Sequence, residues 1–206
     1  MKNILKTLID YSLFEKYDKD YFINNKILPL FENDISIKMA VCKNSKLETI
    51  KNDFNKVISF LEIDELELLF MISHIDQKTL LYSMALKAIS QNSFEKYVDK
   101  FLQELLSFSI NLRASDIHIE QYKDVILFKF RIDGRLKTFF AFYSEFFKLI
   151  SSYIKLISTL DMTQIRLPQD GRFALNIEDK KYDFRVSTMP TLEAESIVLR
   201  ILDNKN

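Results

Sequence analysis

The arginines are the residues of this sequence best suited to chemistry. The chain has 22 lysines but only seven arginines, and all seven lie in its second half. They are Arg113, Arg131, Arg135, Arg166, Arg172, Arg185 and Arg200. A guanidinium group is planar, stays charged, and donates in a fork that matches carboxylate and phosphate oxygens. For any one arginine, pairing with a nearby acid such as Asp116, Asp133 or Asp170 is the simpler interpretation. As a set, they favour a polar interface.

Two of these arginines bound the segment 166–172, which we call the elbow. Its sequence, Arg-Leu-Pro-Gln-Asp-Gly-Arg, holds one of the two glycines and one of the three prolines of the chain. Pro168 fixes its own φ and favours an extended Leu167. Asp170-Gly171 is typical of a turn, because glycine adopts positive φ at no steric cost. The elbow is therefore predicted to be a rigid polar connection between two packed elements; a plain connecting loop is the alternative.

Asp116 and His118 are a candidate acid–base pair, because positions i and i+2 of a strand share one face. No nucleophile or third partner stands at a recognisable spacing, and catalysis requires such geometry. A structural hydrogen-bonding role is therefore favoured. Gln169 and Asp170 could position a water, but a salt bridge from Asp170 to a nearby arginine is favoured. We expect no catalytic residue in this chain.

Metal and disulfide chemistry have little support in the sequence. Cys42 is the only cysteine, which excludes a disulfide within the chain and a cysteine-based zinc site. We expect it to be a small buried residue at the end of a strand. His74 has no second histidine or cysteine at ligand spacing, so we expect no metal site. Because glycine occurs only at 134 and 171, the chain has no Walker A loop to hold phosphate.

Composition narrows the class of protein. With 206 residues, 48% of them apolar, the chain is long enough for one or two packed domains. Its formal net charge of zero argues against a general nucleic-acid binder, which needs a positive surface. No run approaches the roughly 18 apolar residues of a membrane span. Asp10 and Glu15 interrupt any signal-peptide core. The expected location is the reducing cytoplasm.

The first half predicts a small α/β module, residues 1–92. The expected elements are a helix over 3–14, a weaker helix over 18–24, an edge strand over 27–31 containing Pro29, a strand over 35–41, a helix over 45–61, a strand over 66–72 and a helix over 76–89. Ser45 and Glu48 have the spacing of a capping box for the third helix. Nothing in this module indicates chemistry, so a docking or scaffold role is expected.

The second half, residues 93–206, predicts an antiparallel sheet with helices on one face. The expected order is a helix over 93–111, strands over 114–120, 125–131 and 135–142, a helix over 146–160, a hairpin over 172–187 and a strand over 197–202. This αβββαβββ order is typical of PAS-like α+β domains. The fold class of the whole chain is therefore α+β.

A series of motifs in this half resembles one family. They are Arg113-Ala114-Ser115-Asp116-Ile117-His118-Ile119-Glu120, Phe130-Arg131-Ile132-Asp133-Gly134, the elbow, Asp183-Phe184-Arg185-Val186-Ser187-Thr188-Met189-Pro190 and Ile197-Val198-Leu199-Arg200-Ile201-Leu202-Asp203. Their order and spacing are similar to the second N-terminal domain of the secretion-type ATPases of the GspE/PilB family. These ATPases power type II secretion, type IV pilus assembly and DNA uptake in competence. Leu28-Pro29-Leu30 and the elements after it resemble the first N-terminal domain of that family.

The resemblance implies a homo-hexameric motor at the cytoplasmic face of the inner membrane. ATP and Mg²⁺ would be bound mainly by a RecA-like motor domain that follows these two domains, and no cofactor is expected on this chain alone. By motif, Arg185 and Arg200 fall on the arginines that reach the nucleotide phosphates. Arginine suits that role because it offsets the charge of the β- and γ-phosphates. Arg166, Asp170 and Arg172 are expected at a domain or subunit interface.

The implied partners are the motor domain itself and an inner-membrane platform or cytoplasmic adaptor protein; no direct nucleic-acid binding is expected. The sequence departs from the family in three ways: it has no motor motifs, it lacks the tetracysteine zinc site, and it has Ala194-Glu195 where the family usually has Gly-Glu. This chain alone is therefore not expected to hydrolyse ATP, and its end after Asp203 favours an N-terminal fragment. The alternative is a stand-alone PAS-like ligand-binding or scaffold module.

Overall fold

The computed structural model describes residues 8–47, 54–90, 94–192 and 195–202. The chain divides into two compact units, Met1–Ser83 and Met84–Asn206. The division falls inside helix α5 (Ile75–Ser90). The predicted domain boundary, 92/93, lies just beyond this helix, at positions outside the described residues, and it stays a prediction.

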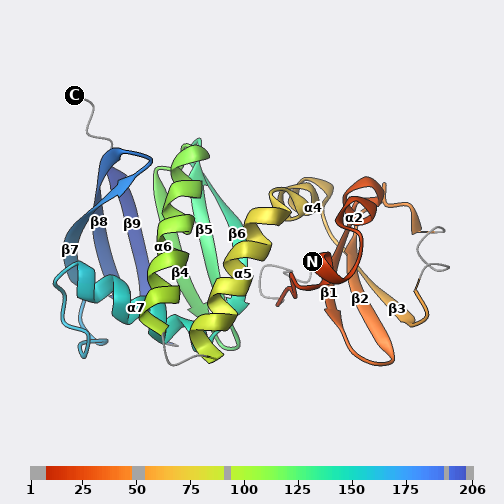
Figure 1. Cartoon of the computed structure of the whole chain (residues 1–206), viewed down its shortest axis with the longest axis horizontal. Helices are drawn as coiled ribbons and strands as arrows, with labels where there is room; N and C mark the ends of the chain where they lie inside the picture. Colours follow the sequence, from red (N-terminus) through yellow and green to blue (C-terminus); the bar gives the residue numbers. More distant parts are fainter. Residues whose placement is uncertain (1–7, 48–53, 91–93, 193–194, 203–206) are drawn as a thin grey trace. The chain divides into compact units, whose positions relative to one another are not determined.

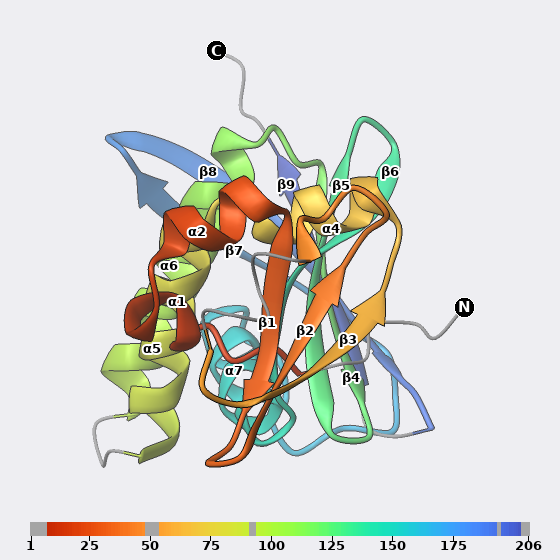
Figure 2. The same ribbon diagram turned by 90° about the vertical axis from the view of Figure 1, so that its right-hand side faces the viewer.

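A three-stranded sheet forms the centre of the first unit, in the order β1-β2-β3. Strand β1 (Ile27–Glu32) pairs antiparallel with β2 (Ser36–Val41), which pairs in parallel with β3 (Val57–Glu62). Figure 2 shows the three strands side by side. Pro29 lies on an edge strand as predicted, where its missing N–H is tolerated. The predicted strand over 35–41 is confirmed, and Cys42 just after it is buried.

Two predicted elements of this unit are wrong. The segment 57–61 is strand β3 rather than helix: its apolar residues fit a helical face, but parallel pairing with β2 decides the outcome. Conversely, the segment 66–72 is helix α4 (Glu65–Ile72) rather than a strand. The carboxylate of Asp64 accepts hydrogen bonds from the backbone N–H groups of Leu66 and Glu67 at 2.9 and 3.2 Å, which starts a helix.

The first predicted helix is largely absent from the described residues, whereas the second is present. The described part of the predicted 3–14 helix contains only α1 (Leu13–Lys16), because residues 8–12 are not helical. Helix α2 (Lys19–Asn25) confirms the weaker prediction and is capped by Asp18. The capping box of Ser45 and Glu48 stays a prediction; in the described residues the Ser45 hydroxyl donates to the carbonyl of Lys26 at 2.5 Å. Glu48 lies outside the described residues.

The second unit has the predicted αβββαβββ order and confirms the α+β class. Its elements are α6 (Phe94–Asn111), β4 (Asp116–Tyr122), β5 (Val125–Ile132), β6 (Arg135–Tyr143), α7 (Glu145–Ile157), β7 (Gln169–Ile177), β8 (Lys180–Pro190) and β9 (Glu195–Leu202). The six strands form one sheet in the order β6-β5-β4-β9-β8-β7, and every neighbouring pair is antiparallel. The predicted Asp133-Gly134 turn is confirmed, with positive φ at both residues.

Phenylalanine rings join the two helices to the sheet. Phe101 of α6 lies 4.8 Å from the ring of Phe146 in α7 and 5.2 Å from the ring of Phe128 in β5. Figure 1 shows α6 and α7 on the same side of the sheet. The alternate residues of the strands therefore project from the other, open face, and the polar side chains of the sheet gather there.

Candidate functional site

Arginines line up across the open face in one row. Antiparallel pairing places Arg172 of β7 opposite Arg185 of β8, and Arg185 opposite Arg200 of β9. Arg200 is in turn opposite Asp116 of β4, and Asp116 is opposite Arg131 of β5. Directly paired residues project from the same face, so these five side chains form a continuous row over five strands. We call it the arginine row.

Asp116 is the single acid of this row and binds the arginine on each side. Its Oδ1 accepts from Arg200 Nε at 2.9 Å, and its Oδ2 lies 3.3 Å from Arg131 Nε. The hydroxyl of Ser115 also donates to Oδ2 at 2.8 Å. Burial raises the pKa of the Asp116 carboxyl, but the contacts from Arg200, Ser115 and Arg131 outweigh it and hold the pKa below its usual range. Asp116 is therefore a charged anchor, in line with the structural role predicted for it.

The other end of the row carries positive charge without such an anchor. Within the described part of the chain, neither Arg172 nor Arg185 has an ion-pair partner. Both side chains are exposed, and so is most of the Arg200 side chain. The three border an open groove of about 640 Å³. Its remaining lining residues are Asp170, Gly171, Val186, Ser187 and Val198.

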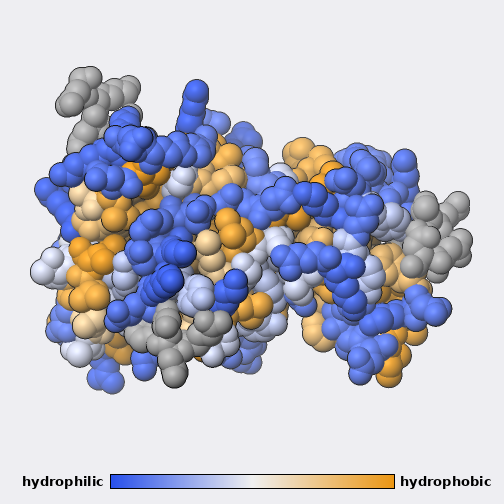
Figure 3. All heavy atoms as spheres, in the orientation of Figure 1, coloured by the Kyte–Doolittle hydropathy of each residue, from blue (hydrophilic) through white to orange (hydrophobic). Residues whose placement is uncertain are grey.

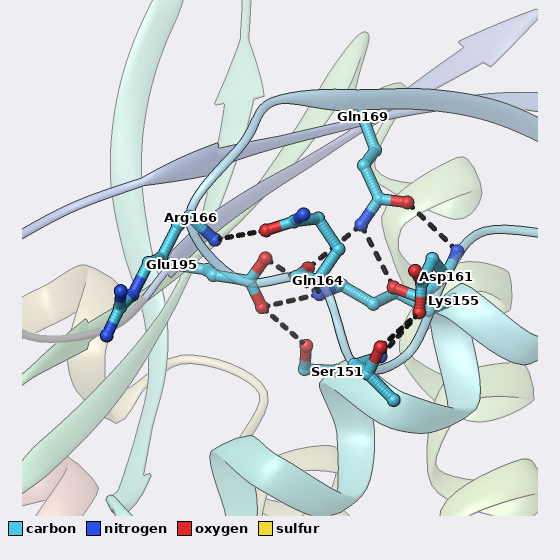
Figure 4. Close-up of polar contacts among 8 residues, drawn as sticks. Ser151, Lys155, Asp161, Gln164, Arg166, Gln169 and Glu195 are labelled. Carbon is cyan, nitrogen blue, oxygen red and sulfur yellow. Dashed lines mark hydrogen bonds and ion pairs between the residues drawn. The ribbon is translucent and has the colours of Figure 1, made fainter.

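The structure brings four of the five predicted site residues to this groove: Arg172, Arg185, Arg200 and Asp170. Asp170 does not form the predicted salt bridge with an arginine in the described structure; instead its Oδ1 accepts from the hydroxyl of Ser187 at 2.6 Å. Arg166 lies outside the groove, in the loop before β7. Its side chain is exposed and points away from the polar network of that loop (Figure 4).

Gly171 does not form the predicted turn. It lies inside β7 and does not have positive φ. A Cβ built at this position would come within 2.8 Å of the backbone oxygen of Ser158 and 2.9 Å of the Leu160 side chain. Glycine is needed here because β7 runs close to the chain that leaves α7, a contact that sequence alone could not indicate.

The loop over 158–168, which leads into the elbow, folds around the side chain of Gln169 and not around Pro168. The Gln169 amide accepts from Asp161 N at 2.9 Å and donates to the carbonyls of Asp161 and Gln164 at 3.0 Å (Figure 4). The side chain of Gln164 in turn accepts from Arg166 N at 3.0 Å. Gln169 is thus committed to these contacts, which argues against its use as a water-positioning residue.

Sequence reasoning missed a buried ion pair next to this loop. Lys155 Nζ of α7 donates to both carboxylate oxygens of Glu195 in β9 at 2.7 Å, and to the carbonyl of Gln164 at 2.8 Å (Figure 4). The Ser151 hydroxyl lies 3.4 Å from the same carboxylate. The two charged side chains are 1% and 4% exposed. A lysine four positions after Ser151 on the inner face of an amphipathic helix is the signal that could have indicated it.

His118 lies beside the arginine row in a network of charges. Its Nε2 is 3.4 Å from Arg131 Nη2, and its Nδ1 is 3.9 Å from a carboxylate oxygen of Glu120. Glu120 also accepts a hydrogen bond from Lys129 at 2.5 Å. Burial, followed by the charge of Arg131, lowers the pKa of His118 and favours the neutral ring. These contacts fit the hydrogen-bonding role that was favoured over catalysis.

Three neighbouring guanidinium groups over an open groove can bind an anion that has several oxygens. Residues 90–206, more than half of the chain, match the family described as "Type II/IV secretion system protein". The chain therefore belongs to this family.

Named relatives agree with the family match. The chain is 42% identical over 107 residues to "Type II secretion system protein E" of Aeromonas hydrophila, a match that covers 52% of this chain and 21% of the relative. It is 41% identical over 109 residues to "Putative type II secretion system protein E" of Escherichia coli K12, covering 53% and 22%. Over 104 residues it is 39% identical to "Type II secretion system ATPase E" of Vibrio cholerae, covering 50% and 21%. The chain thus spans about a fifth of the length of these relatives. No helix in the described residues is long and apolar enough to cross a membrane.

Proposed function

We propose that this chain is the N-terminal regulatory and docking region of a hexameric secretion-type ATPase. In this proposal the second unit closes over ATP and Mg²⁺ held mainly by a RecA-like motor domain. The first unit docks on a platform or adaptor protein at the cytoplasmic face of the inner membrane. The machine served would be a type II secretion, type IV pilus or DNA-uptake apparatus.

The observation that carries the proposal is the pairing of Arg185 with Arg200 on the open face. The two guanidinium groups project from adjacent strands into one groove, and of these two only Arg200 is bound by Asp116. Like charges placed directly opposite destabilise a sheet. A pair kept in this position is explained if it meets an anion, and the phosphates of ATP supply one. Domain closure would then depend on the nucleotide bound.

The test of this role is a fusion of the chain to a RecA-like motor domain of the family. ATP turnover is measured for Arg185→Ala, for Arg200→Ala and for Arg135→Ala, which removes an exposed arginine of β6 at the opposite edge of the sheet. Loss of one charge-assisted contact should lower turnover by about tenfold or more. Arg135→Ala should match the parent fusion. Unchanged turnover in both Arg185→Ala and Arg200→Ala would reject the phosphate role.

Docking by the first unit is supported by exposed leucines on α4. Leu66 is 77% exposed and Leu69 is 38% exposed, and Figure 3 shows hydrophobic surface where Figure 1 places α4. Exposed apolar side chains that gather in one place indicate contact with another protein. Leu66→Glu should weaken binding to the cytoplasmic domain of the platform protein. Leu192→Glu, at a fully exposed leucine of the second unit, should not. Equal binding by both variants would exclude α4 as the docking surface.

A further inference from the structure

Arg172 is the groove residue whose position was not anticipated. The sequence predicts an interface role for Arg172, whereas the pairing of β7 with β8 places it directly opposite Arg185. Its side chain is exposed, and no described carboxylate pairs with it. Asp170, two positions earlier on the same strand, is engaged by Ser187 instead.

We propose that Arg172 is a third phosphate-binding residue, and that the groove by itself holds a polyphosphate chain. The inference rests on the proposed function, because that function is the reason for taking phosphate as the anion. The spacing of the three arginines indicates the shape of the ligand. Neighbouring strands lie about 4.8 Å apart, so three arginines in register cover about 10 Å across the sheet. A chain of linked phosphates lying across β7, β8 and β9 matches this span, whereas a single phosphate would contact all three arginines only if their flexible side chains converged on it.

The arrangement of charge gives this site a direction. Arg200 shares its charge with Asp116, while Arg172 and Arg185 have no acid opposite them. The positive charge of the row is therefore least neutralised at Arg172 and Arg185, although the carboxylate of Asp170 in β7 also lines the groove. The most highly charged end of a polyphosphate, its terminal phosphate, is expected there, next to Arg172. The less charged, substituted end is expected next to Arg200.

The experiment is calorimetric titration of the whole chain with inorganic triphosphate, pyrophosphate and phosphate. We expect triphosphate to bind most tightly and phosphate most weakly. Arg172→Gln, Arg185→Gln and Arg200→Gln should each weaken triphosphate binding by about tenfold or more, since each removes a charge-assisted contact. Arg135→Gln removes the same charge far from the groove and should leave the affinity unchanged. Circular dichroism checks that these surface variants fold.

Four outcomes would overturn the inference. If Arg172→Gln binds triphosphate as the parent chain does while Arg185→Gln and Arg200→Gln do not, Arg172 is not a ligand. If phosphate binds as tightly as triphosphate, or if no triphosphate binding is seen, the groove is no polyphosphate site. A single-stranded oligonucleotide that displaces triphosphate at lower concentration would indicate a nucleic-acid surface instead. None of these outcomes decides the proposed function, which is tested separately by the ATP turnover of the motor fusion with Arg185→Ala and Arg200→Ala.

Discussion

Lys155 and Glu195 form a buried ion pair that ties helix α7 to the first residue of strand β9. The lysine also holds the loop over 158–168 through the carbonyl of Gln164. This contact fixes the path of the chain between α7 and β7. Strand β7 carries Arg172 and β9 carries Arg200, so the pair supports both sides of the groove from beneath the sheet.

Removal of one partner of this pair should destabilise the second unit strongly. Glu195→Gln leaves the ammonium of Lys155 buried without a counter-charge, and breaking a buried pair in this way costs about 3–5 kcal/mol. Lys155→Met should cost a similar amount, because it leaves the carboxylate of Glu195 unpaired. Urea unfolding followed by circular dichroism gives these free energies.

The double variant Lys155→Met/Glu195→Leu is the control for the buried pair. Well-packed apolar residues often replace a buried ion pair without loss of stability. The double variant should therefore be more stable than either single variant. Additive destabilisation in the double variant would show that the two side chains act through packing and not through their charges.

Substitution by asparagine should be tolerated at Gly134 but should destabilise the fold at Gly171. Asparagine tolerates positive φ, and a Cβ at Gly134 meets nothing within 4 Å, so Gly134→Asn should change stability by less than about 1 kcal/mol. At Gly171 the new Cβ would meet the backbone oxygen of Ser158 at 2.8 Å, and such overpacking costs about 1–3 kcal/mol. Urea midpoints of the two variants measure the difference. Equal midpoints would show that the chain at Ser158 moves aside freely.

The sequence predicted the second unit well because its signals are local. The regular spacing of apolar residues predicted α6, α7 and the strands, and Asp133-Gly134 predicted a hairpin turn. The family motifs led to Arg185 and Arg200. The arginine row was not predicted, because register across five strands depends on pairings between residues as far apart as Asp116 and Arg200. The requirement for glycine at position 171 was not predicted either, because it arises from contact with Ser158 and Leu160, which are close in space.

Errors in the first unit have a different cause. Short apolar runs fit both helix and strand periods, and the tertiary partner decides between them. Residues 57–61 have the apolar spacing of a helical face but pair with β2, while 66–72 alternate like a strand but follow the capping residue Asp64. The Asp64 cap was the local signal that could have corrected the second of these predictions.

Glu32 should make the stability of the first unit depend on pH in the acid range. Burial raises the pKa of its carboxyl, but hydrogen bonds from Lys16, Tyr17 and Lys56 outweigh burial and lower the pKa to about 2. A carboxyl with a lowered pKa in the folded state contributes stability above its unfolded pKa of 4.5, and loses it as pH falls from there towards 2. Urea midpoints of the parent chain and of Glu32→Gln should therefore converge over this pH range. A constant difference between the two midpoints would show that the Glu32 contacts do not depend on its charge.

Asp116 should stabilise the arginine row by separating the charges of Arg131 and Arg200. Asp116→Asn leaves four arginines in register with no acid among them, and loss of hydrogen bonds to charged groups costs about 1.5–3 kcal/mol. Because salt screens repulsion between exposed charges, raising the NaCl concentration should recover part of this loss. The measurement is the urea midpoint at low and high NaCl, with Asp124→Asn, in the exposed β4–β5 turn, as the control. A loss at Asp116→Asn that salt does not change would mean that Asp116 acts only through its hydrogen-bond geometry. Recovery by salt would show that charge balance holds the row together.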